Sequence, residues 1–135
     1  LPQKVKAPGL PGTMTSGNLR YLLALYRLEG RQGVRSVAMA RALGLKKPSV
    51  CRMLGNLRDL GLVDKDAYGA AFLTPAGRDL AGRYCRYYQA VDRWIQGEFP
   101  HSGDLEGPVC ALLLELPEES LRRFQLREEQ EGQRL

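Results

Sequence analysis

The segment GLKKPSVCRMLGNLRDLGLV, residues 44–63, decides the fold that we expect for this chain. Its apolar residues follow the i, i+3, i+4, i+7 spacing of a helix that buries one face. They are Val50, Met53, Leu54 and Leu57. Pro48 suits the first turn, because the amide hydrogen that proline lacks would have no helical acceptor there. The spacing therefore predicts a helix over residues 48–60.

A shorter helical pattern comes directly before this segment. In VRSVAMARALGL, residues 34–45, Ser36 is a candidate N-cap and Gly44 ends the apolar periodicity. The earlier stretch SGNLRYLLALYRLEG, residues 16–30, also has apolar residues at helical spacing. Three short helices, the last two joined by a tight Gly-Leu turn, predict a helix-turn-helix.

The chain then changes character over residues 62–73. Two short strand-like runs enclose a polar turn that contains Asp66 and Gly69, which is typical of the hairpin called a wing. Thr74 and Pro75 follow as an N-cap and a first helical residue. They open a long helical pattern that spans roughly 30 Å.

We therefore predict a mainly α fold, in which a winged helix-turn-helix is joined by a long helix to a C-terminal helical dimerisation region. The run VCALLLEL, residues 109–116, is too apolar to stay exposed on a small monomer, so we expect a homodimer. The expected parts are a flexible N-terminal arm at 1–15, a DNA-binding domain at 16–75, and a dimerisation region with a charged C-terminal tail at 76–135.

The net charge of +5 is unevenly distributed. Residues 1–95 carry 16 Lys and Arg against 6 Asp and Glu, whereas residues 96–135 carry 4 against 9. A basic first part predicts contact with a polyanion, and helix 48–60 predicts double-stranded DNA. For Arg35 and Arg41 two interpretations stand: a phosphate contact, or a charge that is simply solvated. The candidate DNA-contacting residues are Lys46 and Lys47 just before this helix, Pro48, Ser49, Arg52 and Asn56 on it, and Lys65 and Tyr68 on the wing.

Other classes of protein are disfavoured. The single histidine, His101, lies in a Gly/Pro-rich loop, and no phosphate-binding glycine motif or paired-carboxylate pattern accompanies it, so we expect no enzyme. Three cysteines without CxxC pairing predict reduced thiols. With no membrane-length apolar run and no signal peptide pattern, we expect a cytoplasmic protein without membrane contact.

Taken together, KPSVCRML, LGLV, YGAAFLTPAGRDLA and the tyrosine-rich helix after them resemble the diphtheria-toxin-repressor and manganese-transport-regulator family. The resemblance covers roughly residues 16–116. It implies a dimeric bacterial winged-helix repressor that a divalent metal activates, and the length predicts that the family's SH3-like domain is absent.

The metal-binding pattern of that family is where this sequence departs. The resemblance places ligands at six positions, of which only Glu106 and Cys110 carry ligand-capable groups. The other four positions hold Arg20, Leu23, Tyr88 and Val109. Our interpretation is that no metal cofactor is used, and that a pair between Arg20 and Glu106 replaces the metal's charge. The alternative is a regulator that responds to another signal.

Several alternatives stay open at this stage. The chain can be a genuine manganese- or iron-dependent repressor with atypical ligands, or its winged helix can serve protein contact. Our interpretation of Tyr84, Tyr88 and Trp94 is aromatic core packing against a second subunit, and an organic ligand beside them is the alternative.

Overall fold

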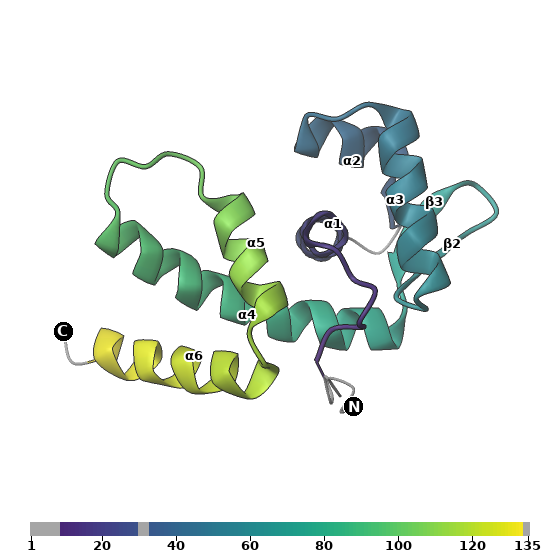
Figure 1. Ribbon diagram of the computed structural model, residues 1–135. Helices are drawn as coiled ribbons and strands as arrows, with labels where there is room; N and C mark the ends of the chain where they lie inside the picture. Colours follow the sequence, from purple (N-terminus) through teal and green to yellow (C-terminus); the bar gives the residue numbers. More distant parts are fainter. Residues whose placement is uncertain (1–8, 30–32, 134–135) are drawn as a thin grey trace. The chain divides into compact units, whose positions relative to one another are not determined.

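The computed structural model describes residues 9–29 and 33–133, which form six helices and three short strands (Figure 1). The elements are α1 (Ser16–Leu28), β1 (Val34–Arg35), α2 (Ser36–Leu43), α3 (Lys47–Asp59), β2 (Val63–Lys65), β3 (Ala70–Leu73), α4 (Pro75–Glu98), α5 (Glu106–Glu115) and α6 (Glu118–Gln133). None of these helices is long and apolar enough to cross a membrane.

Two compact units divide the chain. Among the described residues, one unit runs from Gly17 to Gly82, and the other joins residues 9–16 to residues 83–133. The division therefore falls inside α4, rather than at residue 75 where we had placed a domain boundary. Leu10 and Met14 belong to the second unit and are buried, although they lie in the stretch that we expected to be a flexible arm. Residues 1–8 of that arm lie outside the described residues.

The first unit is a winged helix-turn-helix. Gly44 takes a left-handed conformation with φ 65° at the end of α2, which allows the tight turn into α3. The buried face of α3 consists of Val50, Leu54 and Leu57, whereas Met53, which we expected in this face, is only half-buried.

The sheet has the order β1-β3-β2, with both pairs antiparallel. Strands β2 and β3 form the wing, which extends to the side of α3 in Figure 1. Strand β1 was not anticipated. It places Arg35, rather than Ser36, at the N-cap of α2, and Ser36 is the first helical residue.

A set of short contacts fixes the point where the wing becomes α4. The hydroxyl of Thr74 donates to the carbonyl oxygen of Gly61 at 2.7 Å and accepts from the amide of Gly77 at 3.0 Å, which confirms the predicted N-cap. The amide of Thr74 donates to the carbonyl oxygen of Leu62 at 3.0 Å. Gly77 passes so close to Leu62 that an added Cβ would overlap the Leu62 carbonyl group. Only glycine fits there.

A buried ion pair holds the second unit. The carboxylate of Glu118, whose side chain is 3% exposed, accepts from Arg83 Nε and from the hydroxyl of Tyr87, each at 2.7 Å. Burial acts to raise the pKa of Glu118, but these two hydrogen bonds and the nearby positive charges hold it below its ordinary value. The contacts tie the first turn of α6 to α4.

Much of the apolar run at residues 109–116 is used inside this unit. Val109, Cys110 and Leu113 are buried, whereas Leu116 is exposed. The residues that we expected to form a charged tail continue α6 in regular helical form as far as Gln133. Part of the run therefore belongs to the core of a single chain. Its apolar character does not by itself require a dimer.

The contact between Gly77 and Leu62 generates a stability prediction. Replacing Gly77 with Ala forces the wing and α4 apart, so we expect the free energy of unfolding to fall by at least about 2 kcal/mol. Urea unfolding followed by circular dichroism measures this loss. Gly55→Ala is the matched control, because an added Cβ at Gly55 meets nothing within 4 Å. It should leave stability unchanged or raise it by up to about 1 kcal/mol. Equal stability of the two variants would contradict the packing described.

Candidate nucleic-acid interface

The first turn of α3 is a concentrated positive site. Lys46 is its N-cap and Lys47 its first residue, and no acidic residue lies in that turn. The unpaired amide groups of a helix N-terminus carry partial positive charge, so two lysines there are unfavourable unless an anion is nearby. Neither lysine forms an ion pair with any residue in the described parts of the chain. This end of α3 is therefore suited to phosphate.

The face of α3 opposite its buried stripe is solvent-exposed. Ser49, Arg52 and Asn56 are all exposed, and Pro48 is exposed in the first turn as predicted. Arg52 has no ion-pair partner among the described residues, and Asn56 makes only a weak 4.0 Å contact with the sulfur of Met53. The helix thus leaves the side chains that can read base edges uncommitted.

The wing has a well-ordered turn. The carboxylate of Asp66 accepts from the amide of Tyr68 at 2.8 Å and from that of Ala70 at 2.9 Å, while Gly69 has φ 85°. This geometry leaves the Tyr68 side chain 81% exposed at the tip. Lys65 lies on β2 and is half-buried.

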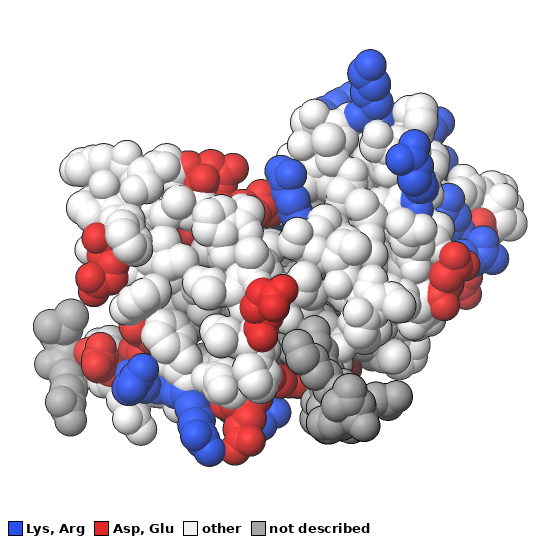
Figure 2. Space-filling model, in the orientation of Figure 1, with Lys and Arg blue, Asp and Glu red and all other residues white. Residues whose placement is uncertain are grey.

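Arg35 and Arg41 differ in their surroundings. The guanidinium of Arg35 donates to the carbonyl oxygen of Tyr68 at 3.4 Å, so it is partly engaged in holding the wing. Arg41 is exposed on α2 and makes no ion pair within the described residues. On the face shown in Figure 2, Lys and Arg side chains gather over α2 and α3, while Asp and Glu are more frequent over α5 and α6.

One buried carboxylate of this unit was missed in the sequence. Glu29, whose side chain is 5% exposed, accepts from Arg78 at 2.6 Å and from the amide of Leu73 at 3.2 Å. It therefore joins the end of α1 to β3 and α4. A signal was present, since Glu29 is the only acidic residue among the first 58.

The six positions where the family resemblance places metal ligands are split between the units. Arg20 and Leu23 lie on α1, whereas Tyr88, Glu106, Val109 and Cys110 lie on α4 and α5. Leu23, Val109 and Cys110 are buried. Within residues 9–29 and 33–133, no three side chains of His, Cys, Asp or Glu are grouped closely enough to hold a metal ion. The pairing of Arg20 with Glu106 stays a prediction.

The fold of this unit, with an exposed basic face on α3, is that of a winged helix-turn-helix, an arrangement typical of DNA-binding proteins. Residues 14–71 match the family model described as the iron dependent repressor, N-terminal DNA binding domain. Over this part the chain is similar to the diphtheria-toxin-repressor and manganese-transport-regulator family, as the resemblance predicted.

Two relatives are named Transcriptional regulator MntR. That of Salmonella typhimurium (strain LT2) is 36% identical over 61 residues, which are 45% of this chain and 39% of the relative. That of Escherichia coli O6:H1 (strain CFT073) is 34% identical over the same length and the same shares of both chains. The chain thus spans about two-fifths of the curated relatives it matches.

Solved structures share the fold. The manganese regulator SloR has a TM-score of 0.68 at 21% identity, covering 82% of this chain and 53% of that one. ScaR with bound Zn²⁺ has a TM-score of 0.61 at 18% identity, covering 83% and 53%. IdeR of T. acidophilum has a TM-score of 0.56 at 20% identity, covering 87% and 55%.

These comparisons correct our interpretation that no metal cofactor is used. The matched family is described as iron-dependent, and two of the structural neighbours are titled as a manganese regulator and a Zn²⁺-bound protein. That interpretation was wrong because it rested on the side-chain chemistry at six single positions. The similarity to iron-dependent repressors instead extends over residues 14–71.

The two lysines generate a prediction about salt. We expect the variant Lys46→Gln/Lys47→Gln to bind a random-sequence duplex more weakly. The slope of log K against log salt concentration should become smaller in magnitude by about two per chain, because each lost phosphate contact removes roughly 0.9 from it. Fluorescence anisotropy across a salt series measures it. Arg93→Gln, at an exposed position in the other unit, is the control and should keep the parent slope. A double variant with the parent slope would place the phosphate contacts elsewhere.

Proposed function

We propose that this chain is a metal-responsive transcriptional regulator that binds duplex DNA through α3. Two features of α3 carry the proposal. Val50, Leu54 and Leu57 are fully buried along one face, and the exposed first turn holds two lysines without an acidic residue. A helix held by one face in this way presents its other face rigidly. An α-helix of this kind fits the major groove of B-DNA.

The chemistry of the exposed side chains assigns them roles. Arg52 is suited to a bidentate pair with guanine, and Asn56 to a pair with adenine. Lys46, Lys47 and Ser49 are suited to phosphate oxygens, which fix orientation without reading sequence. On the wing, Lys65 and Tyr68 are placed for contact with the backbone or the minor groove.

We propose that the regulator acts as a homodimer on a two-fold symmetric site, as a non-enzymatic protein of the bacterial cytoplasm. Support comes from the apolar side chains that stay exposed on the C-terminal unit, of which Phe99 and Leu126 are 58% and 53% exposed. Covering such side chains in an interface is favourable at about 25 cal/mol per Å² of apolar surface.

Metal control is supported by the comparisons rather than by the donor set. Glu106 and Cys110 lie one turn apart on α5 and supply one oxygen and one sulfur ligand. Manganese and ferrous iron prefer several oxygen or imidazole donors, so these two residues alone do not fit such an ion. We therefore assign no ligand and route no step of DNA binding through the metal.

Selection of bound duplexes from a random pool tests the proposal. The chain is incubated with EDTA in one arm and with MnCl₂ or anaerobic FeSO₄ in the others. We expect a two-fold symmetric sequence to be enriched, with tighter binding when metal is present. Arg52→Ala should relax the preference at one base pair of each half-site, at a cost of about 1–3 kcal/mol on the enriched sequence.

Each contrary result has a distinct meaning. Enrichment that neither metal changes would overturn metal control and leave DNA binding in place. Failure of any sequence to be enriched in all arms would overturn the DNA-binding proposal and favour a winged helix that contacts protein.

A further inference from the structure

The tip of the wing is linked to the start of α2 by the side chain of Arg35. This residue ends β1 and is the N-cap of α2, and its guanidinium donates to the carbonyl oxygen of Tyr68 at 3.4 Å. Within the described residues, no other side chain from outside residues 63–73 forms a hydrogen bond with the turn at residues 66–69. Arg35 therefore connects the helix-turn-helix to the far end of the hairpin.

The backbone from which Arg35 reaches the tip is itself fixed. Strand β1 pairs with β3 in the antiparallel sense, with Arg35 opposite Ala70. Gly33, two residues earlier, lies so close to β3 that an added Cβ would stand 2.7 Å from the carbonyl oxygen of Ala71. The Arg35 side chain thus extends from an anchored strand, so its hydrogen bond limits how far the tip can move.

Tyr68 is held through the peptide groups on both of its sides. Its amide donates to the carboxylate of Asp66 at 2.8 Å, and its carbonyl oxygen accepts from Arg35. Its side chain, in contrast, is 81% exposed. The ring is therefore fixed at its base and open to a partner, and a contact that is positioned in advance loses less entropy when the partner binds.

We propose that Arg35 is a positioning residue for the wing, which acts on DNA binding through Tyr68. The inference rests on the proposed function, because it requires that the wing meets DNA. A direct contact of Arg35 with phosphate is the competing role, since this side chain is exposed and forms no ion pair in the described parts of the chain. We favour positioning because the guanidinium is directed at a carbonyl oxygen of the tip that Asp66 does not hold.

A double-mutant cycle separates the two roles. Affinity for the duplex enriched by selection is measured by fluorescence anisotropy, with MnCl₂ in every sample, for Arg35→Gln, Tyr68→Ala and the variant that carries both changes. We expect Arg35→Gln to bind about three-fold more weakly and Tyr68→Ala about five-fold, in keeping with the loss of one exposed contact each. The double variant should bind no more weakly than Tyr68→Ala, because Arg35 has nothing left to position.

The salt dependence gives a second readout from the same samples. Arg35→Gln should keep the parent slope of log K against log salt concentration, whereas loss of a phosphate contact would reduce its magnitude by about 0.9. Arg93→Gln removes an equally exposed guanidinium from the other unit and should keep the parent affinity.

The free chain offers a readout that does not involve DNA. Backbone order parameters from ¹⁵N relaxation should fall at Tyr68 and Gly69 in Arg35→Gln, from about 0.85 toward 0.6, and stay unchanged over α3. This result would show that the side chain holds the tip before any partner is present.

Two results would overturn the role of Arg35 alone. One is a loss of affinity that adds to that of Tyr68→Ala and comes with a smaller salt slope, which would show a direct phosphate contact. The other is a set of order parameters at the tip that Arg35→Gln leaves unchanged. Failure of the parent to bind any duplex would instead overturn the proposed function, and the order parameters would still report whether Arg35 holds the tip.

Discussion

The hydroxyl of Thr74, placed between the carbonyl oxygen of Gly61 and the amide of Gly77, is the interaction on which the DNA-binding unit depends. It starts α4 where the wing ends, and the absence of a side chain at Gly77 lets α4 lie against Leu62. Glu29 adds a second tie, from the end of α1 to Leu73 and Arg78. Each such hydrogen bond contributes about 1 kcal/mol, and together they fix where the wing stands beside α3.

The proposed recognition of DNA depends on that arrangement, because α3 is held by only one of its faces. Val50, Leu54 and Leu57 are fully buried, which orients Arg52 and Asn56 toward solvent. The positive charge at the start of the helix has no compensating acid among the residues that the structure describes. A bound phosphate would therefore lower its energy. In the proposed function, stability and recognition thus use opposite faces of the same helix.

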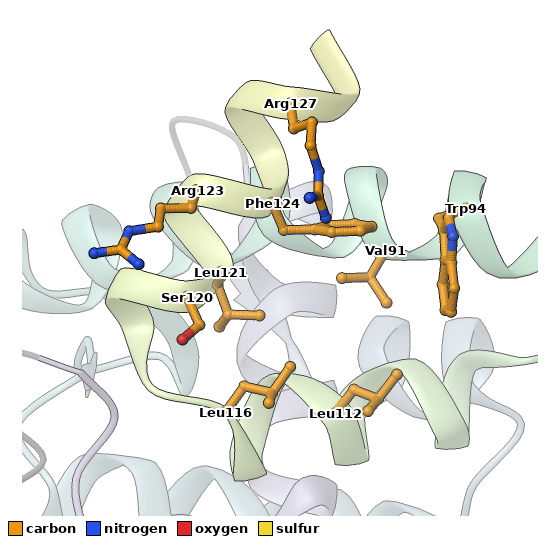
Figure 3. A pocket seen from close by; sticks show the side chains of 9 residues that line it. All are labelled: Val91, Trp94, Leu112, Leu116, Ser120, Leu121, Arg123, Phe124 and Arg127. Atoms are coloured by element: carbon orange, nitrogen blue, oxygen red, sulfur yellow. The ribbon is translucent and has the colours of Figure 1, made fainter. Parts of the chain in front are cut away.

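Local spacing predicted much of this unit, and long-range contact explains what was missed. The period of α3, the Asp66 turn and the Thr74 cap are all encoded within a few residues, and the structure contains each of them. The partners of Glu29 lie 44 and 49 residues away, so no local pattern reveals them. Strand β1 has only two residues and forms by pairing with β3. The apolar groove of the C-terminal unit (Figure 3) is formed by residues of three different helices, α4, α5 and α6, so no local pattern predicts it. Metal use was misjudged because the side chains at single positions were weighed without the similarity of the whole matched segment.

The most direct test of the central claim is a map of backbone amide chemical shifts as a duplex enriched by selection is added to the full chain. If α3 and the wing form the reading surface, the largest changes fall at residues 46–56 and 65–69, and they diminish as salt is raised. Changes confined to α5 and α6, or none at a concentration that saturates binding, would show that the exposed basic face of α3 is not the surface that meets DNA.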